Sequence, residues 1–185
     1  MNGNGPNAAV LDFYLAKHPA PPKIILIGMS MGGYLAPRAA AFDSRIDGVV
    51  SFDVFYNLAE TARRTADSAP NLLTERGPGL AWAINNAEWT LGFSDPKDFV
   101  KKFEPYTLEQ VASRISCHVL IFAGGEDHFI PVKQLDEFAR SCTGARSVES
   151  FVFNRQSGGA EHCQIGANTL WHEKFFDWII RRFLS

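Results

Sequence analysis

The sequence predicts an α/β fold, with a mostly parallel sheet and helices on both of its faces. Short apolar runs at 24–27, 46–55 and 117–124 alternate with segments that favour helix. Strands buried on both faces of a parallel sheet have this continuous apolar character. A closing helix is expected over 167–183, where apolar side chains recur at helical spacing: Trp171, Phe175, Trp178, Ile179 and Phe183. Such a stripe is more typical of core packing than of a ligand site.

The remaining elements follow from local patterns. We expect an amphipathic helix over 8–17, which the Pro-rich stretch 18–22 ends. A helix over 34–41 follows the first strand, although Pro37 interrupts its pattern. A short helix is predicted over 107–113 and a longer one over 131–141. Residues 147–153 alternate between apolar and polar, which favours a fourth strand.

Residues 57–106 differ from the rest of the chain. Fifty residues are too many for a plain connection between two strands, and insertions of this length usually carry a function. Pro70 and the Gly-Pro-Gly at 77–79 favour short, broken helices, so we predict a helical cap insertion. Its aromatic residues either pack the insertion onto the body or line a pocket: Trp82, Trp89, Phe93, Phe99, Phe103 and Tyr106.

Composition restricts the function classes. The 185 residues fit one domain, expected to span 1–185. With 18 basic and 20 acidic residues, the net charge of −2 argues against nucleic acid or an acidic membrane as the main partner. No apolar run approaches the ~20 residues that span a bilayer, and no signal-peptide pattern is visible. Three scattered cysteines without C-x-x-C spacing argue against a zinc site or disulfide framework, and a reducing, cytoplasmic setting is expected. No cofactor is expected.

The stretch Gly28-Met29-Ser30-Met31-Gly32 matches the G-x-S-x-G pattern of a nucleophile elbow. In such an elbow a sharp strand-to-helix turn holds the serine hydroxyl above the sheet, and the glycines allow neighbouring backbone to pass closely. The following helix directs its N-terminus at the same point, which favours developing negative charge. Ser30 is therefore the candidate nucleophile, and the backbone N–H of Met31 is the candidate oxyanion donor.

A serine nucleophile needs a base and an orienting acid. In proteins with a G-x-S-x-G elbow, the acid and then the histidine follow the serine along the chain. Asp127 lies in a turn directly after the third strand, and His162 lies in the loop before the closing helix. Glu126 is an alternative acid, although the G-x-x-D-x-x-x-P register of 124–131 favours Asp127. His128 is adjacent to the acid on one turn, so we interpret it as a rim residue.

The end of the second strand should lie beside Ser30 if the two strands are parallel neighbours. Phe52, Asp53 and Phe55 would then bind substrate at the pocket floor. Asp53 has an alternative interpretation, as a turn residue at the end of the strand.

These motifs together resemble the C-terminal part of the α/β-hydrolase superfamily. GMSMGGYLAPRAAAFDSRIDGVVSFD, GGEDHFIP and GAEHCQIG are similar to one branch, which holds fungal hydrolases that shorten polyketides in pigment biosynthesis and 2,6-dihydropseudooxynicotine hydrolase. The resemblance implies Ser30, Asp127 and His162 as nucleophile, acid and base, acting on a small-molecule ketone, β-diketone or ester. Members of the branch are commonly dimers, so a homodimer is among its implications.

The sequence also departs from that family. A complete α/β-hydrolase has further strands before the elbow, and a loop among them supplies a second oxyanion donor. Only 29 residues precede Ser30, so we expect an N-terminally truncated domain whose first strand has an unpaired edge. The leading hypothesis is a serine hydrolase cleaving a C–C or ester bond next to a carbonyl. The alternatives are an impaired pseudo-hydrolase that acts as an interaction module, and a general carboxylesterase or peptidase of the same fold.

Overall fold

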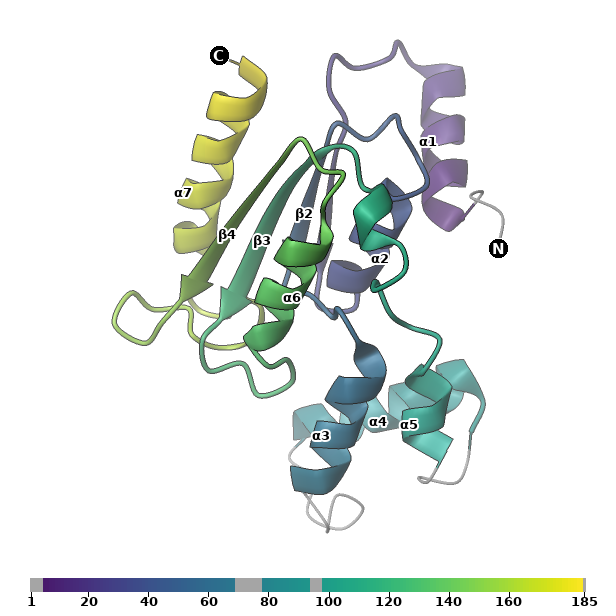
Figure 1. The fold of residues 1–185 in the computed structure, drawn as a ribbon, viewed down its shortest axis with the longest axis vertical. Helices are drawn as coiled ribbons and strands as arrows, with labels where there is room; N and C mark the ends of the chain where they lie inside the picture. Colours follow the sequence, from purple (N-terminus) through teal and green to yellow (C-terminus); the bar gives the residue numbers. More distant parts are fainter. Residues whose placement is uncertain (1–4, 69–77, 94–97, 185) are drawn as a thin grey trace. The chain divides into compact units, whose positions relative to one another are not determined.

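A four-stranded parallel sheet organises the computed structural model, which describes residues 5–68, 78–93 and 98–184 (Figure 1). The strands follow in the order β1-β2-β3-β4 and comprise Ile25–Met29, Gly48–Phe52, His118–Gly124 and Ser147–Phe153. Neighbouring strands are parallel and in register, with Met29 opposite Phe52 and Phe52 opposite Phe122. The predicted α/β class with a parallel sheet is therefore confirmed. All four carboxyl ends meet at one edge of this sheet.

The helices of the sheet-containing part are α1 (Pro6–Lys17), α2 (Gly32–Ala40), α6 (Lys133–Ser141) and α7 (Asn168–Ile179), which a π-helical turn continues over Ile180–Leu184. Two predicted elements are shorter in the structure. The second strand ends at Phe52 because Asp53 has a φ of 53°, outside the extended region. The helix expected over 107–113 is reduced to a single 3₁₀ turn, Ala112–Arg114.

Helix α7 covers one face of the sheet, and the aromatic stripe predicted from the sequence forms its core. Trp178 is fully buried among Val50, Phe52, Leu120 and Phe122. The rest of the stripe packs around this cluster: Trp171, Phe175, Ile179 and Phe183. Since side chains alternate along a strand, the intervening residues of β2 and β3 point to the opposite face, which α2 and α6 cover.

Pro37 lies inside α2 without breaking it. A proline cannot donate the helical hydrogen bond to the carbonyl four residues earlier, which here belongs to Gly33. The hydroxyl of Ser51, a fully buried residue of β2, donates to that Gly33 oxygen over 2.7 Å instead. The interruption noted in the sequence is therefore compensated by a neighbouring strand.

Strand β1 lies at the edge of the sheet. Within the ranges that the structure describes, β1 pairs with β2 on one side and with no strand on the other. Its Ile27 and Met29 are 39% and 44% exposed, unlike the fully buried strand β2. The unpaired edge expected for this strand is therefore present in the described residues.

Residues 57–107 form a second compact unit, and the rest of the chain forms the first. The second unit contains α3 (Leu58–Ser68), α4 (Pro78–Leu91) and α5 (Asp98–Phe103). Four of its predicted aromatics contact one another in sequence, Phe93 with Phe99, Phe99 with Phe103 and Phe103 with Tyr106. By contrast, Trp82 and Trp89 are 69% and 84% exposed. Pro70 and Gly77 lie outside the described residues, and the role of this segment as a cap stays a prediction.

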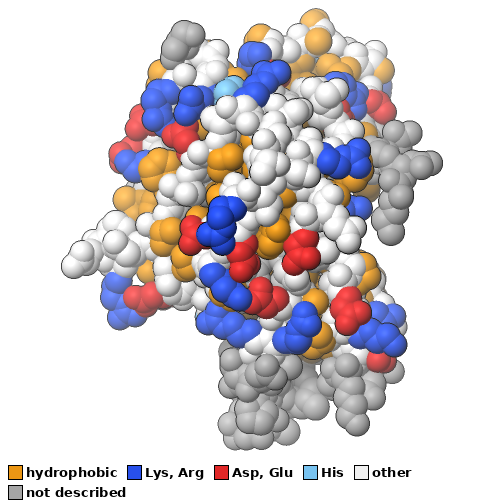
Figure 2. Space-filling view, in the orientation of Figure 1, with side chains coloured by type: hydrophobic (Ala, Val, Ile, Leu, Met, Phe, Trp, Pro, Cys, Tyr) orange, Lys and Arg blue, Asp and Glu red, His pale blue; other side chains and the backbone are white. Residues whose placement is uncertain are grey.

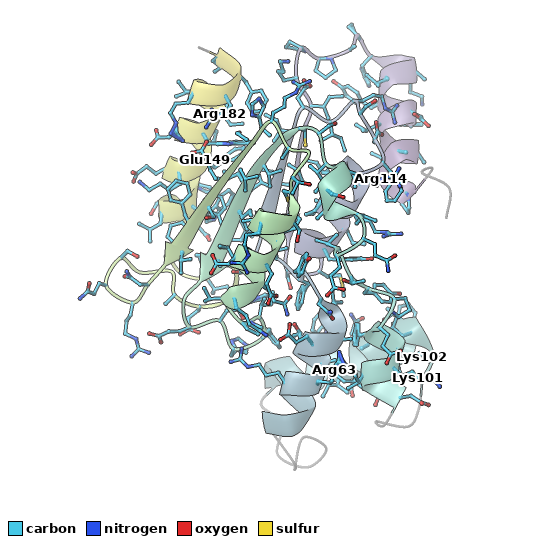
Figure 3. All side chains as sticks on the ribbon, viewed as in Figure 1. Arg63, Lys101, Lys102, Arg114, Glu149 and Arg182 are labelled. Atoms are coloured by element: carbon cyan, nitrogen blue, oxygen red, sulfur yellow. The ribbon has the colours of Figure 1, made fainter. Side chains whose placement is uncertain are left out.

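Charged side chains of both signs are interspersed on the face shown in Figure 2. At the end of the chain, Glu149 of β4 accepts hydrogen bonds from Arg181 and Arg182, which holds the π-helical turn to the sheet (Figure 3). None of the helices over the described residues has the length and apolar character required to cross a membrane.

Candidate active site

Ser30 sits on a strained turn between β1 and α2. Its φ is 54°, a left-handed backbone conformation that costs a non-glycine residue about 1–3 kcal/mol. Two hydrogen bonds hold the turn, since the Ser30 N–H donates to the Phe52 carbonyl over 3.0 Å and the Gly33 N–H donates to the Ser30 carbonyl over 2.7 Å. The sharp strand-to-helix turn expected from the G-x-S-x-G pattern is therefore present.

The glycines of this turn are not equivalent. A Cβ atom at Gly28 would lie 1.8 Å from the Gly32 carbonyl oxygen, so β1 and the start of α2 approach too closely for any side chain. A Cβ atom at Gly32 would meet nothing within 4 Å. The second close approach occurs one residue later, where a Cβ atom at Gly33 would lie 2.7 Å from the Asp53 oxygen. The expectation that Gly32 allows close passage was wrong, and Gly33 has that role.

Three predicted site residues form one chain of hydrogen bonds. The Nε2 atom of His162 lies 2.8 Å from Ser30 Oγ, and its Nδ1 atom lies 2.7 Å from Asp127 Oδ2. Because an ionised carboxylate only accepts hydrogen bonds, Nδ1–H is the donor to Asp127. The other nitrogen of a neutral imidazole is then free to accept the Ser30 hydroxyl proton. The residues are 132 and 35 positions apart in the sequence, and the sheet edge brings them together.

The Asp127 carboxylate is fixed by its own turn. Its Oδ1 atom accepts the backbone N–H of Phe129 over 2.7 Å and that of Ile130 over 3.0 Å, which leaves Oδ2 for His162. The neighbouring Glu126 instead pairs with Arg155 at the exposed surface. The structure thus separates the two candidate acids, and only Asp127 contacts the histidine.

His128 lies beside His162, and their ring centroids are 6.2 Å apart. The ring of Phe129 is nearer, at 5.0 Å between centroids with an edge-on orientation. The sequence interpretation did not include Phe129. Its position two residues after Asp127, on the turn that follows β3, was the available signal.

The loop that carries His162 passes over the end of β3. A Cβ atom at Gly124 would lie 2.4 Å from the Ala160 oxygen, so this strand end must be a glycine for the loop to approach. The 3₁₀ turn His162–Gln164 contains two residues in the left-handed region, Cys163 with a φ of 54° and Gln164 with a φ of 47°. Such a loop persists only where its surroundings hold it in place.

The environment of His162 favours its charged form. Burial disfavours a charged imidazolium and lowers the pKa of His162, but the hydrogen bonds and charges of Asp127 and Cys163 outweigh burial and raise that pKa above its ordinary value. A raised pKa makes the imidazole of His162 a stronger base.

The three residues predicted for the pocket floor have different positions. Phe52 is fully buried in the core, where its ring contacts those of Phe122 and Trp171, so it offers no surface to a ligand in this structure. The carboxylate of Asp53 is also buried and accepts two backbone N–H groups. Phe55 is half-buried, and its ring centroid lies 6.5 Å from that of His162. Of these three residues, only Phe55 keeps part of its surface exposed near His162.

The N–H group of Met31, at the start of α2, donates no hydrogen bond to the part of the chain that the structure describes. This amide immediately follows Ser30 and remains available to an anion.

Cysteine chemistry and metal binding can be assessed from the same geometry. Cys117 and Cys142 are buried, and burial raises their thiol pKa values to about 11 and about 12, which makes both poor nucleophiles.

Asp53, His162 and Cys163 offer ligand atoms within 4.8 Å of one another. However, the Asp53 oxygens and both His162 nitrogens already take part in hydrogen bonds, which a metal ion would have to displace.

The architecture is known from solved structures. The chain superposes on 2,6-dihydroxy-pseudo-oxynicotine hydrolase with a TM-score of 0.71 and 19% identity, over 98% of this chain and 47% of the other. The chain has part of the α/β-hydrolase fold. The same fold is seen in the Pyrococcus furiosus esterase Pf2001, with a TM-score of 0.70 and 19% identity over 93% of this chain and 59% of the esterase.

Curated sequences similar to this chain include fungal hydrolases. The chain is 24% identical to hydrolase acrC of Aspergillus aculeatus over 87% of its own length, and 26% identical to 20-hydroxy-prefusarin hydrolase FUS2 of Gibberella moniliformis over 85%. It spans 42% of each of these relatives. No family model matches the sequence. The resemblance to fungal and pseudo-oxynicotine hydrolases predicted from the elbow and histidine loop is thus confirmed.

Proposed function

We propose that the chain carries the catalytic triad of a serine hydrolase that attacks a carbonyl carbon, with Ser30 as nucleophile, His162 as general base and Asp127 as the orienting acid. The observation that supports this most directly is the continuous hydrogen-bond chain through the three side chains. The strained φ of Ser30 and the two amides that fix Asp127 add to it, because both restrict the reacting groups to one geometry.

The proposed reaction has two stages. As Ser30 Oγ bonds to the carbonyl carbon, its proton passes to His162 Nε2, and Asp127 stabilises the imidazolium through Nδ1–H. The tetrahedral intermediate then collapses, and the imidazolium returns the proton to the leaving group. Water then gives a proton to His162 as it attacks the acyl carbon. The bond between that carbon and Ser30 Oγ breaks, His162 returns the proton to Oγ, and a carboxylic acid is released.

Met31 has a separate part in this proposal. Its unused backbone N–H would donate to the oxygen anion of the intermediate, and the N-terminus of α2 adds a favourable dipole. One such donor contributes about 10²–10³ in rate, so the chain's own amide supplies a substantial share of anion stabilisation.

The substrate class is a small molecule with an ester, or a C–C bond between two carbonyls. In the second case the bond to the attacked carbonyl breaks, its electron pair leaves as an enolate, and the His162 proton converts the enolate to a ketone. A similar sequence named 20-hydroxy-prefusarin hydrolase supports hydrolysis of a small molecule, and an esterase with the same fold is consistent with the first of the two classes. Because the chain spans under half of its curated relatives, a binding module with an impaired triad is the alternative function.

A fluorophosphonate probe tests the proposal. It phosphonylates an activated serine, so purified protein should gain one adduct on the peptide that contains Ser30. Ser30→Ala should abolish labelling, whereas Ser44→Ala, at an exposed turn serine, should leave it unchanged. Folded protein, judged by circular dichroism, that shows no Ser30-dependent labelling would refute the catalytic proposal and favour the binding module. If Ser30 is labelled, the rates at which the protein hydrolyses a p-nitrophenyl ester and a β-diketone are compared to separate the two substrate classes.

A further inference from the structure

Asp53 joins three parts of the site that are distant in the sequence. It follows β2 directly, and its backbone N–H donates to the Phe122 carbonyl over 2.8 Å. Its Oδ1 atom accepts the N–H of Gly124, at the end of β3, over 3.0 Å. Its Oδ2 atom accepts the N–H of Cys163, in the histidine loop. The same oxygen lies 3.7 Å from the Nδ1 atom of His162.

These contacts distinguish Asp53 from an ordinary turn residue. A carboxylate that caps its own turn accepts amides within two or three positions along the chain. The amides bound by Asp53 are instead 71 and 110 positions away. The residue is 1% exposed and its side chain is fully buried, so a substrate in solution has no access to it in this structure. Any effect of Asp53 on the site must therefore act through the residues that it contacts.

We propose that Asp53 is a positioning residue for His162. Its carboxylate ties the histidine loop to the end of β3 and places a second negative charge beside the ring nitrogen that Asp127 binds. This inference rests on the proposed triad, since it assigns Asp53 a part in holding and charging the base of that triad.

The loop that carries His162 is strained. Cys163 and Gln164 both have positive φ values, and the amide between His162 and Cys163 has to be held for the ring to face Ser30. The Cys163 N–H donates to Asp53, whose other oxygen is fixed by Gly124. An asparagine could accept only one of these two amides, and its own NH₂ would face the other. The site therefore requires a carboxylate, not merely a side chain of that size.

Four ionisable side chains among the described residues lie near the imidazole of His162. Asp127 contacts Nδ1 at 2.7 Å, Asp53 lies 3.7 Å from the same atom, Cys163 is the adjacent residue, and the His128 ring is 6.2 Å away between centroids. Burial and the charge of Asp127 raise the pKa of Asp53, while its two amide hydrogen bonds and His162 oppose that rise. A negative charge this close favours the imidazolium.

The pH titration of the His162 ring, followed by NMR, tests this inference without any enzymatic activity. Asp53→Asn should lower the pKa of the His162 imidazole by about 1–3 pH units, the usual effect of removing an opposite charge within 4–6 Å. Asp136→Asn, which removes an exposed carboxylate on α6, should leave it unchanged. If the probe reacts with Ser30, the pH at which the labelling rate is half of its maximum should fall in Asp53→Asn by the same amount as the pKa of His162.

The outcomes are distinct from those of the labelling test. A folded Asp53→Asn protein whose His162 titrates as in the wild type would overturn the inference, whether or not Ser30 reacts. Wild-type protein provides a second measurement in case the variant does not fold. The Cys163 and Gly124 amides should exchange with deuterium more slowly than the amide of Gln156, an exposed residue in the turn that follows β4. Exchange of the Cys163 amide at the rate of an exposed loop would also refute the proposed tie.

Discussion

Replacing Gly28 with alanine should destabilise the protein far more than the same change at Gly32, although the G-x-S-x-G pattern contains both. The new methyl group would lie 1.8 Å from the Gly32 carbonyl oxygen, 2.4 Å from its carbonyl carbon and 2.7 Å from the Cβ atom of Ala36. Ordinary contact begins at 3.4 Å, so β1 and the first turn of α2 would have to separate by about 1.6 Å. Both obstacles nearest the methyl group are backbone atoms, which cannot rotate away.

The magnitude follows from this overlap. Overpacking a core costs about 1–3 kcal/mol, and a clash with backbone belongs at or above the upper end of that range. About 3 kcal/mol corresponds to a melting temperature lower by ~6–12 °C for a chain of this size. A displacement of this size at the elbow would also break the 2.8 Å contact between Ser30 Oγ and His162 Nε2.

Thermal unfolding followed by circular dichroism measures the first effect, and fluorophosphonate labelling below the melting temperature measures the second. Gly32→Ala is the matched control, because its methyl group meets nothing within 4 Å and alanine is favoured over glycine in a helix by about 0.5–1 kcal/mol. This control should melt at or slightly above the wild-type temperature. Equal melting temperatures for the two variants would refute the reasoning.

Two further predictions concern the acid and the base. Asp127→Asn should lower the rate of Ser30 labelling by about 10²–10⁴, because the imidazole loses the partner that fixes its tautomer. Glu126→Gln should change that rate less than twofold, because the Glu126 side chain pairs with an exposed arginine. Equal effects of the two substitutions would contradict the assignment of Asp127 as the acid. The labelling rate should also rise with pH through a midpoint above 6.5, because the base acts only when neutral and its pKa is raised in the folded protein. The same raised pKa means that His162 stabilises the folded protein. This contribution is complete at pH values below the pKa of His162 in the unfolded chain, and it is lost as the pH rises through the pKa of His162 in the folded protein. A denaturant titration across this pH range measures that loss, and stability that rises over the window would contradict it.

The local patterns of the sequence determined much of the fold. The apolar runs predicted the strands, and the aromatic stripe of 171–183 predicted which face of α7 packs on the sheet, because periodicity along one segment reflects what that segment buries. The spacing of elbow, post-strand acid and pre-helix histidine also predicted three residues that lie in hydrogen-bond contact in the structure.

Where local patterns failed, the deciding contact came from a distant segment. Strand alternation could not show that Phe52 faces the core under α7, since that depends on which side the helix covers. Pro37 resembled a helix breaker because the hydroxyl that compensates for its missing N–H belongs to Ser51, on the distant strand β2. Glycine at position 32 resembled a steric requirement, and only the packing of β2 against α2 shows that the requirement falls on Gly33.

Asp53 shows most clearly the difference between what local sequence patterns predict and what contacts with distant segments decide. The sequence placed it at the end of a buried strand beside the serine, which proved correct. Its partners, the amides of Gly124 and Cys163, come from two other segments that meet only when the sheet is assembled. A residue's type and period are properties of its own segment, whereas the groups that a buried carboxylate must satisfy are set by the tertiary structure around it.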